Sequence, residues 1–421
     1  MRSVNEDQTL EFDVVIIGGG AAGIGAALGA ARSGSRVCLV EMYGFLGGAA
    51  TTGSVLTHCG FFDQTKEQVV RGAGQQVLDK LEQHKIYQAQ TMEESGNTVV
   101  LLDMETTKSV YDELMGEAGV SLFLHSRLVS AETSDGIITS IQFAHRGGTV
   151  TVEARAFVDC SGDGALIAAA GAQHIVSPVD QRQASTLVLR VGRVDEDADL
   201  SSAGMERAVT AYAEKTGVSL VRKSGIAVRL PVSREVFLLL ADQHRDVLDV
   251  AELTRAEVEG RQLGWHYFNA FRESLSGWQS SFLSATGPQL GIRESRRLVG
   301  VDSVSADDVS DARKRPEDAV ARCGWPMEDH VEPGITEYGG IKDKGWYHIP
   351  YGAICSASTE NLWAGGRLVS SDNRAFASLR VMGTSLATGH ACGVAAAVYV
   401  RHGAHHYGLT RQGLEEQGAL I

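Results

Sequence analysis

Three glycines near the N-terminus have the spacing of a loop that binds a pyrophosphate. The motif is Gly18-x-Gly20-x-x-Gly23, with Ala22 inside it. A β-branched apolar run at 12–17 predicts a buried strand before it, and the composition of 21–33 predicts a helix after it. The first glycine allows a tight turn, the second a close approach of backbone to phosphate, and the third close helix–strand packing. Because the helix N-terminus also offers N–H donors, these residues predict a dinucleotide site.

Glu41 ends the next expected strand, at 35–41, and lies 18 residues after Gly23. An acidic residue at about this distance accepts a hydrogen bond from a ribose hydroxyl. The same carboxylate disfavours a 2′-phosphate, so we expect no NADP at this site. FAD and NAD remain as candidates.

The segment after Glu41 favours FAD over NAD, because it resembles a known FAD-binding segment. Its Gly47-Gly48 pair is similar to the FAD-binding continuation of the glutathione reductase superfamily. More narrowly, the chain resembles the FAD-dependent oxidoreductase family related to the flavoprotein subunits of succinate dehydrogenase and fumarate reductase. The stretches that carry this resemblance are 46–63, 103–124, 157–171, 291–308 and 349–397, whereas about 190–285 matches poorly.

This resemblance implies FAD as the cofactor and assigns further residues to it. The residues that it adds are Gly47, Gly48, Thr52, Gly162, Asp163, Gly366, Arg367, Arg380 and Thr384. It places the segment 380–384 at the start of a closing helix whose N-terminus faces the flavin ring, where helix N–H groups stabilise negative charge. The chain departs from the family by having Gly383 in place of Pro, His390-Ala391-Cys392 in place of Gln-Ala-Ala, and 371–373 in place of a frequent His.

Four residues are candidates for catalysis: His58, His348, Tyr351 and Arg380. The resemblance places His58 beneath the flavin ring, where a histidine can act as a general base. A loop histidine bonded to backbone is the alternative, and covalent flavin attachment through His58 or Cys59 is a third reading. His348 and Tyr351 belong to the strand that the family places beside the flavin, and ordinary strand packing is their alternative role.

Two further stretches allow both a functional and a structural reading. The arginine-rich stretch 291–298 could clamp a carboxylate or a phosphate, although arginine–glutamate pairs within one turn are more often structural. The aromatic stretch 265–282 could line a substrate pocket, form a domain core or form a dimer seam.

Composition excludes several classes of partner. The chain has 421 residues and a formal charge of −14, which opposes nucleic acid and anionic lipid as main partners. Its apolar runs are too short to cross a bilayer, and residues 1–13 lack the apolar core of a secretory signal, so we expect a cytoplasmic protein without a membrane partner. Its six cysteines form no C-x-x-C pair, so neither a redox dithiol nor an ordinary metal cluster is expected.

These signals predict an α/β protein, with a glutathione reductase-like, Rossmann-type FAD-binding domain and an interleaved mixed α+β substrate domain. The expected boundaries are 10–185 for the first FAD-binding part with a small insertion at about 60–100, 186–345 for the substrate domain, 346–405 for the closing FAD-binding part and 406–421 for a tail. The longer helices are expected at 67–85, 105–118, 246–271 and 378–400.

The function expected from these residues is that of a dehydrogenase or oxidase. It takes a hydride from a C–H bond of a small organic substrate onto flavin N5 and passes the electrons to O₂ or another acceptor. A monooxygenase that uses NAD(P)H and O₂, and a flavoprotein subunit that passes electrons to a protein partner, are the alternatives. An RNA-modifying flavoprotein is disfavoured by the acidic charge, and a homodimer is the default assembly.

Overall fold

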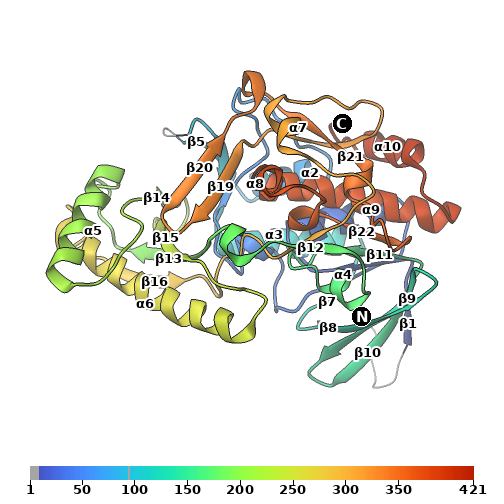
Figure 1. Cartoon of the computed structure of the whole chain (residues 1–421), viewed down its shortest axis with the longest axis horizontal. Coiled ribbons are helices and arrows are strands. Elements are labelled where there is room, and N and C mark those ends of the chain that lie inside the picture. The colour runs from blue at the N-terminus through green and yellow to red at the C-terminus, as the bar shows by residue number, and fades with distance from the viewer. Residues whose placement is uncertain (1–8, 93–94) are drawn as a thin grey trace.

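A five-stranded parallel sheet forms the centre of the main body (Figure 1). The structure is a computed structural model that describes residues 9–92 and 95–421. The sheet has the order β22-β11-β2-β3-β7. Its strands are β2 (Val14–Ile17), β3 (Val37–Val40), β7 (Ser121–Phe123), β11 (Ala156–Asp159) and β22 (Leu362–Ala364). All except β7 are buried at every residue, as the continuous apolar runs require, and the expected α/β, Rossmann-type fold is confirmed.

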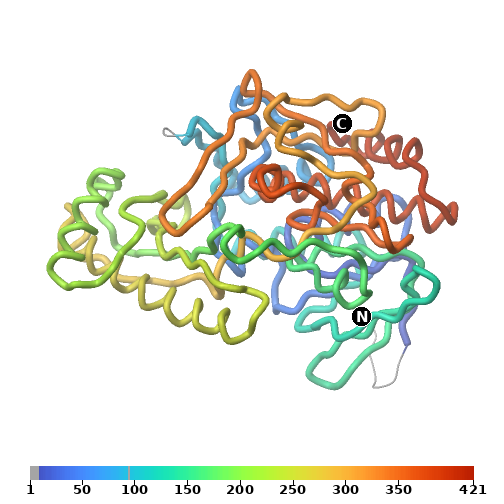
Figure 2. The backbone as a smooth tube through the Cα atoms, viewed as in Figure 1, coloured from blue at the N-terminus to red at the C-terminus, as the bar shows by residue number. Residues whose placement is uncertain are grey.

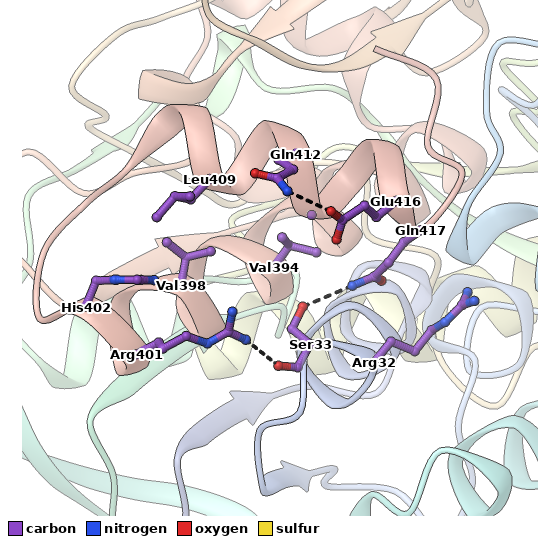
Figure 3. A pocket seen from close by; sticks show the side chains of 11 residues that line it. Arg32, Ser33, Val394, Val398, Arg401, His402, Leu409, Gln412, Glu416 and Gln417 are labelled. Carbon is purple, nitrogen blue, oxygen red and sulfur yellow. Dashed lines mark hydrogen bonds between the residues drawn. The ribbon is translucent and has the colours of Figure 1, made fainter.

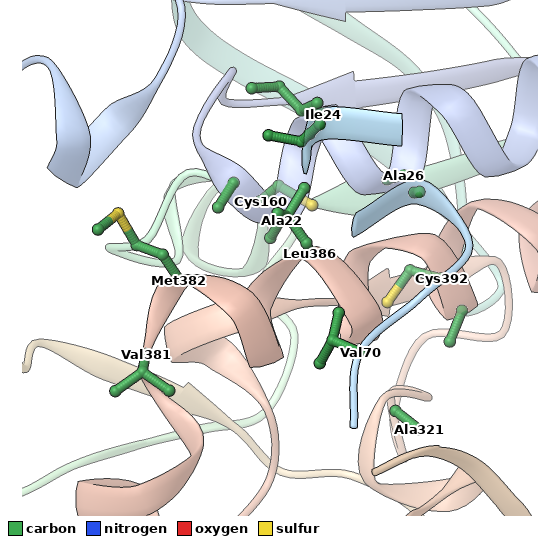
Figure 4. Close-up of a cluster of buried hydrophobic side chains, with 14 of the residues drawn as sticks. Ala22, Ile24, Ala26, Val70, Cys160, Ala321, Val381, Met382, Leu386 and Cys392 are labelled. Atoms are coloured by element: carbon green, nitrogen blue, oxygen red, sulfur yellow. The ribbon is translucent and has the colours of Figure 1, made fainter. Parts of the chain in front are cut away.

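Helices α1 (Ala21–Arg32) and α9 (Met382–His402) pack against each other beside this sheet. Each helix carries glycines four residues apart at the contact, namely Gly25 and Gly29 on α1 and Gly389 and Gly393 on α9. A Cβ on Gly389 would lie 1.9 Å from the Ala22 carbonyl oxygen, and one on Gly393 would lie 2.0 Å from that of Ala26. Figure 4 shows the small side chains of Ala22 and Ala26 among the larger apolar ones that fill the rest of this core.

Other elements complete the main body. Helices α2 (Ala73–Gln83) and α3 (Met104–Glu117) contact α1, and α10 (Tyr407–Glu416) packs on α9. A second sheet has the order β1-β10-β9-β8 and a third the order β4-β6-β5. Their strands are β1 (Thr9–Glu11), β4 (Thr57–His58), β5 (Gln88–Thr91), β6 (Thr98–Leu101), β8 (Arg127–Ser134), β9 (Ile137–His145) and β10 (Gly148–Glu153). The short helix α4 (Ala165–Ala169) contacts β8 and β11.

A second body with its own apolar core extends from the main one, on the left of Figure 1. It is an antiparallel sheet in the order β14-β15-β13-β16 that packs against the long helix α6 (Val250–Ser274), which in turn contacts α5 (Ser202–Thr216). Its strands are β13 (Ser185–Gly192), β14 (Ile226–Arg229), β15 (Val236–Gln243) and β16 (Phe282–Thr286).

Three short antiparallel pairs complete the strands that the structure describes, and all of their strands except β12 follow the second-body sheet in the chain. The pairs are β12 (His174–Val176) with β17 (Arg296–Leu298), β18 (Ala319–Cys323) with β21 (Tyr347–Pro350), and β19 (Met327–Glu332) with β20 (Ile335–Gly339). Helices α7 (Ala306–Ser310) and α8 (Asn373–Leu379) contact each other. The backbone trace of Figure 2 shows the orange hairpin β19–β20 reaching towards the green second body.

Three expected elements differ from the structure. The helix expected from 67 begins only at Ala73, because Gly72 has a φ of +63°. The helix expected at 378–400 is two helices, α8 and α9, bent by 94° at the break. The expected tail at 406–421 contains α10.

Within the described residues, no single helix is both long enough and apolar enough to span a bilayer. The bent pair α8 and α9 passes that test only when the two helices are taken together.

We expect Gly389→Ala to lower the thermal unfolding midpoint, because the added methyl group would overlap the α1 backbone and cost about 1–3 kcal/mol or more. Gly116→Ala in α3 is the matched control, since nothing lies within 4 Å of its added Cβ. Alanine favours a helix over glycine by up to about 1 kcal/mol, so the control should unfold at an equal or higher temperature. Equal midpoints for the two variants would contradict the close packing of α1 on α9.

Candidate functional site

The expected cofactor residues gather at the carboxyl edge of the parallel sheet, where Rossmann-type folds bind nucleotides. The glycine motif follows β2, Glu41 follows β3, Asp163 lies in the turn after β11, and Gly366 follows β22. We call this set the cofactor cradle; it consists of Gly18, Gly20, Ala22, Gly23, Glu41, Gly47, Gly48, Thr52, Gly162, Asp163, Gly366, Arg367 and Thr384.

The three motif glycines of the cradle have distinct surroundings. Gly18 has a φ of +96°, and a Cβ there would lie 2.5 Å from the Cys160 carbonyl oxygen. A Cβ on Gly23 would lie 1.8 Å from the Gly18 carbonyl oxygen. The space around Gly20 is more open, since its nearest neighbour would be the Gly48 Cα at 3.5 Å. Gly18 and Gly23 therefore serve the turn and the packing, and Gly20 keeps the backbone approachable.

The N-terminus of α1 fits an anionic cofactor group. Its N-cap is Gly20, which offers no side-chain cap, and the first turn contains no acidic residue. The N–H groups of that turn and the positive end of the helix dipole therefore suit a pyrophosphate.

Glu41 joins two loops of the cradle through backbone hydrogen bonds. Its Oε2 accepts from the Gly19 N–H at 2.6 Å and its Oε1 from the Tyr43 N–H at 2.9 Å. Burial raises the pKa of Glu41, and these hydrogen bonds oppose that shift. The Gly47 N–H donates to the Gly19 carbonyl oxygen at 2.9 Å, so the Gly47-Gly48 loop lies directly against the glycine motif.

The remaining cradle residues connect the turn after β11 with the loop after β22. The Arg367 guanidinium donates to the Ile292 carbonyl oxygen at 2.7 Å and lies 3.5 Å from an Asp163 carboxylate oxygen. A Cβ on Gly366 would lie 3.0 Å from that of Ala22, so this loop meets the start of α1. The hydroxyl groups of Thr52 and Thr384 instead make internal bonds, to the Gly48 carbonyl oxygen and the Cys323 thiol.

A cavity of about 1020 Å³ lies beside the cradle and reaches the second body. We call it the central cavity. Cradle-side residues Ala49, Arg367 and Met382 line one part of it, and the second-body strands β13, β14 and β15 line another. The charged and imidazole side chains on its wall are Arg222, Asp242, Arg293, Glu328, His330, Arg367 and Arg380. Its volume is at the top of the range of about 300–1,000 Å³ for ligand pockets.

Glu328 and His330 lie two residues apart on β19 and both face this cavity. His330 Nε2 is 3.6 Å from Glu328 Oε1, and His330 Nδ1 is 3.0 Å from the Thr336 hydroxyl. Burial acts to raise the pKa of Glu328, but contact with His330 and the charges of Arg380 and Arg293 hold it down at about 2. Burial and the charge of Arg293 lower the pKa of His330 to about 3. The site therefore presents an ionised carboxylate beside a neutral imidazole.

A second set of polar side chains on the cavity wall forms a hydrogen-bond network centred on Asp242. Asp242 on β15 accepts from Arg222 Nε at 2.6 Å, from the Thr186 hydroxyl at 2.5 Å and from the Gly334 N–H at 3.0 Å. Arg293 donates to the same Thr186 hydroxyl at 2.7 Å and also to the Ala184 carbonyl oxygen. This network joins β13, β15 and the β19–β20 turn at the cavity wall.

Of the four expected catalytic residues, the structure brings only Arg380 to the central cavity. The His58 side chain is fully buried on the other face of β4, edge-on to Phe61, while Thr57 and Cys59 face the cavity. Neither ring nitrogen of His58 has a hydrogen-bond partner, and burial lowers its pKa to about 3. A base in the cavity therefore has to be sought elsewhere than at His58.

His348 and Tyr351 lie near α10 and not at the cavity wall. His348 Nδ1 accepts from the Arg315 N–H at 2.7 Å, and burial lowers the pKa of this histidine to about 4. The Tyr351 hydroxyl is 3.0 Å from His405 Nδ1, and burial raises the pKa of the tyrosine. Both side chains are held by neighbouring elements of the main body, as in the packing role that the sequence left open.

The arginine-rich stretch 291–298 divides between the two roles that were considered for it. Arg297 is buried, forms an ion pair with Glu294 at 2.5 Å and bonds Asn373, so its role is structural. Arg293 lines the cavity. The sequence offered Arg293 only as one arginine of the stretch 291–298, and it did not indicate Glu328 or His330. The alternation Glu328-x-His330 in a strand was the one signal that could have indicated the latter two.

The aromatic stretch 265–282 forms core and surface rather than the wall of the cavity. Tyr267, Phe268, Phe271 and Trp278 are buried in the core of the second body, whereas Trp265 and Phe282 are about half exposed.

A smaller hollow of about 420 Å³ lies where α1, α9 and α10 end (Figure 3). Arg401 donates to the Ser33 carbonyl oxygen at 2.6 Å, and the Gln417 amide donates to the Ser33 hydroxyl at 3.0 Å. The first bond attaches α9 to the end of α1 and the second attaches the end of α10 to it, so these polar groups have a structural role.

No group of three metal-ligating side chains is found among residues 9–92 and 95–421. The six cysteines are free thiols, and burial raises the pKa of Cys59, the one at the cavity wall.

Comparison with known proteins agrees with this geometry. Residues 13–417 match the model of the family described as FAD dependent oxidoreductase. The chain belongs to this family. FAD is therefore its cofactor, and the protein is an FAD-dependent oxidoreductase.

Curated relatives of this oxidoreductase match only short segments. The chain is 42% identical over 71 residues to an aerobic glycerol-3-phosphate dehydrogenase of Staphylococcus haemolyticus, a match that covers 16% of this chain and 13% of that protein. It is 31% identical over 122 residues to an alpha-glycerophosphate oxidase of Streptococcus pneumoniae, with 27% and 20% covered. The match thus spans a fifth or less of the length of these distant relatives.

Solved structures support the fold. A geranylgeranyl bacteriochlorophyll reductase-like protein from Thermoplasma acidophilum has a TM-score of 0.51 at 12% identity, with 97% of this chain and 83% of that chain covered. The aromatic hydroxylase CabE has a TM-score of 0.50 at 12% identity, with 97% and 66% covered. At such identities the likeness shows the FAD-binding architecture alone.

We expect Gly18→Ala to purify without bound FAD, because the new side chain would meet the Cys160 backbone at a φ of +96°. Gly34→Ala is the matched control, since Gly34 also has a positive φ, +88°, but nothing lies within 4 Å of its added Cβ. The measurement is the amount of FAD released per folded chain. Equal FAD contents in the two variants would contradict the assigned role of the loop.

We expect the oxidoreductase to lose stability as the pH falls below about 6.5, where unfolded histidines bind protons. Burial lowers the folded-state pKa of His58 to about 3 and that of His390 to about 4, so the unfolded state binds more protons in this window. His58→Leu should reduce the difference in unfolding free energy between pH 7.5 and pH 5.5 by about 1.4 kcal/mol. Urea unfolding at both pH values measures it, with the exposed His402→Gln as control; equal reductions in both variants would contradict the assignment to His58.

Proposed function

We propose that this oxidoreductase is a dehydrogenase or oxidase that acts on a C–H bond of a small organic substrate bound in the central cavity. The observation that carries the proposal is the position of this cavity, which extends from the FAD cradle to a wall bearing Glu328 and His330. The cofactor site and an acid–base pair thus adjoin one cavity, an arrangement suited to substrate oxidation.

FAD supplies the electron-accepting chemistry, and the protein has to position the substrate and move a proton. His330 is the candidate proton acceptor, because its imidazole is neutral and faces the cavity. The Glu328 carboxylate beside it stabilises the imidazolium that would form. Trp325 Nε1 donates to Glu328 Oε2 at 3.2 Å and fixes the carboxylate.

Two features support transfer of electrons towards the cradle. The N-terminus of α9 has neither a side-chain cap nor an acidic residue in its first turn, so its positive end is not neutralised there. Arg380 immediately precedes it and lines the cavity. Negative charge that develops on a bound cofactor would be stabilised at this end.

Several finer statements belong to the same proposal. The curated relatives are named as a dehydrogenase and an oxidase, which is in keeping with it. Four parts of the proposal rest on the sequence alone. They are a closer kinship with the flavoproteins of succinate dehydrogenase and fumarate reductase, an electron acceptor such as O₂, a cytoplasmic location and a homodimer.

The experiment is anaerobic reduction of the purified, FAD-containing protein. We expect neither NADPH nor NADH to bleach the oxidised-flavin band, whereas an organic donor does so, because no second G-x-G-x-x-G motif provides a nicotinamide domain. Dithionite is the control that shows the flavin is reducible. Rapid bleaching by NADPH or NADH would contradict the proposal and favour the monooxygenase reading.

A further inference from the structure

The charges on the wall of the central cavity are unequal. Four arginines and two carboxylates of the described chain line it, so the wall has an excess of two positive charges. The whole chain has a formal charge of −14. A positive cavity in a strongly negative protein marks the cavity as a place where an anion is favoured.

Two of the four arginines already have anionic partners. Arg222 pairs with Asp242 at 2.6 Å, and Arg367 lies 3.5 Å from Asp163. Arg293 and Arg380 differ, because their hydrogen-bond partners in the described part of the chain are neutral oxygen atoms. Arg293 Nη1 bonds the Thr186 hydroxyl and the Ala184 carbonyl oxygen, and Arg380 Nη2 bonds the Glu328 carbonyl oxygen at 2.9 Å.

Both guanidiniums retain unused donors. A guanidinium has five N–H donors, and the buried Arg380 Nε has no partner. Burial lowers the pKa of Arg380, and it lowers that of Arg293 to about 10 even though Asp242 opposes the shift. The two arginines also repel each other. The Glu328 carboxylate opposes the pKa shift of both arginines, so one negative charge is shared between two positive ones. The positive charge that remains is costly in a folded protein unless a ligand compensates it.

Hydrogen bonds from two parts of the chain hold these two arginines. Arg293 is held by backbone and hydroxyl oxygens at the start of β13, and Arg380 by β19 at the bend between α8 and α9. Guanidiniums held in this way are oriented before a ligand arrives, which favours bidentate recognition of an oxyanion.

We infer that Arg293 and Arg380 bind the anionic group of a small organic oxyanion, a carboxylate or a phosphate monoester, in the central cavity. If the proposed function holds, this anion is the substrate, and its reacting carbon lies between the arginines and the FAD cradle. The Glu328–His330 pair stands beside the bound anion. Burial and the charge of Arg293 keep His330 unprotonated. The anion offsets the second of these causes, so its binding would make this imidazole a stronger proton acceptor.

The test uses unreactive probes, so that binding is measured apart from turnover. Propionate and ethyl phosphate are titrated into the FAD-containing full chain, each beside its neutral counterpart, propionamide or ethanol, at constant ionic strength. Perturbation of the flavin absorption spectrum reports binding. We expect at least one anion to bind at least about tenfold more tightly than its neutral counterpart, and the stronger anion identifies the class.

Variants assign the binding to the two arginines. Arg293→Gln and Arg380→Gln should each weaken anion binding at least about tenfold. Arg272→Gln, the same charge change on the exposed face of α6, should leave it unchanged. FAD content and the unfolding midpoint show whether each variant is folded.

The inference is overturned if neither anion binds the unsubstituted protein better than its neutral counterpart, or if folded variants of both arginines bind as the control does. The outcome is separable from that of the proposed function. Anion binding without any organic donor that reduces the flavin would leave this inference standing and remove the dehydrogenase proposal. Reduction of the flavin by a neutral organic donor, with no anion binding, would support the dehydrogenase proposal and overturn this inference.

Discussion

Direct backbone contact between α1 and α9 is the constraint on which the site depends. Gly25, Gly29, Gly389 and Gly393 leave no room for a Cβ at the helix contact, and a Cβ on Gly365 in the loop after β22 would lie 3.1 Å from the Gly389 Cα. The contact brings the N-termini of two helices to one edge of the parallel sheet. Because neither end has a side-chain cap or an early acidic residue, both present N–H donors and positive dipole ends to an anionic cofactor.

The parallel sheet with α1 and α9 forms a frame for the site. The charges on the cavity wall come from the junction between this frame and the second body. Its strands β13 and β15 contribute the Thr186–Asp242 group, and the β19–β20 hairpin contributes Glu328 and His330. The resulting wall is cationic although the protein is acidic. The frame thus provides the FAD site, and the junction with the second body provides the chemical selectivity of the space beside it.

Local sequence signals predicted the frame, whereas contacts between distant segments determine which residues line the cavity. The glycine motif and Glu41 lie within one βαβ unit, so their spacing alone placed them. The sequence placed His58 beneath the flavin, but neighbouring side chains of a strand point to opposite faces. Thr57 and Cys59 therefore face the cavity, and His58 faces the core. Arg293 and Glu328 reach the same cavity wall through contacts of the β13 region with Gly291 and with His330, which the sequence does not encode locally. Composition alone missed the break before α9, because apolar residues stand on both sides of Arg380, whereas the family resemblance placed the start of the helix at 380–384.

The most direct test of this account is an experimental structure of the protein with FAD bound. We expect the pyrophosphate at the N-terminus of α1 and the flavin ring between the Gly47-Gly48 loop and the start of α9, with one edge open to the central cavity. A flavin ring that lies away from the cavity, or a pyrophosphate away from the N-terminus of α1, would contradict it.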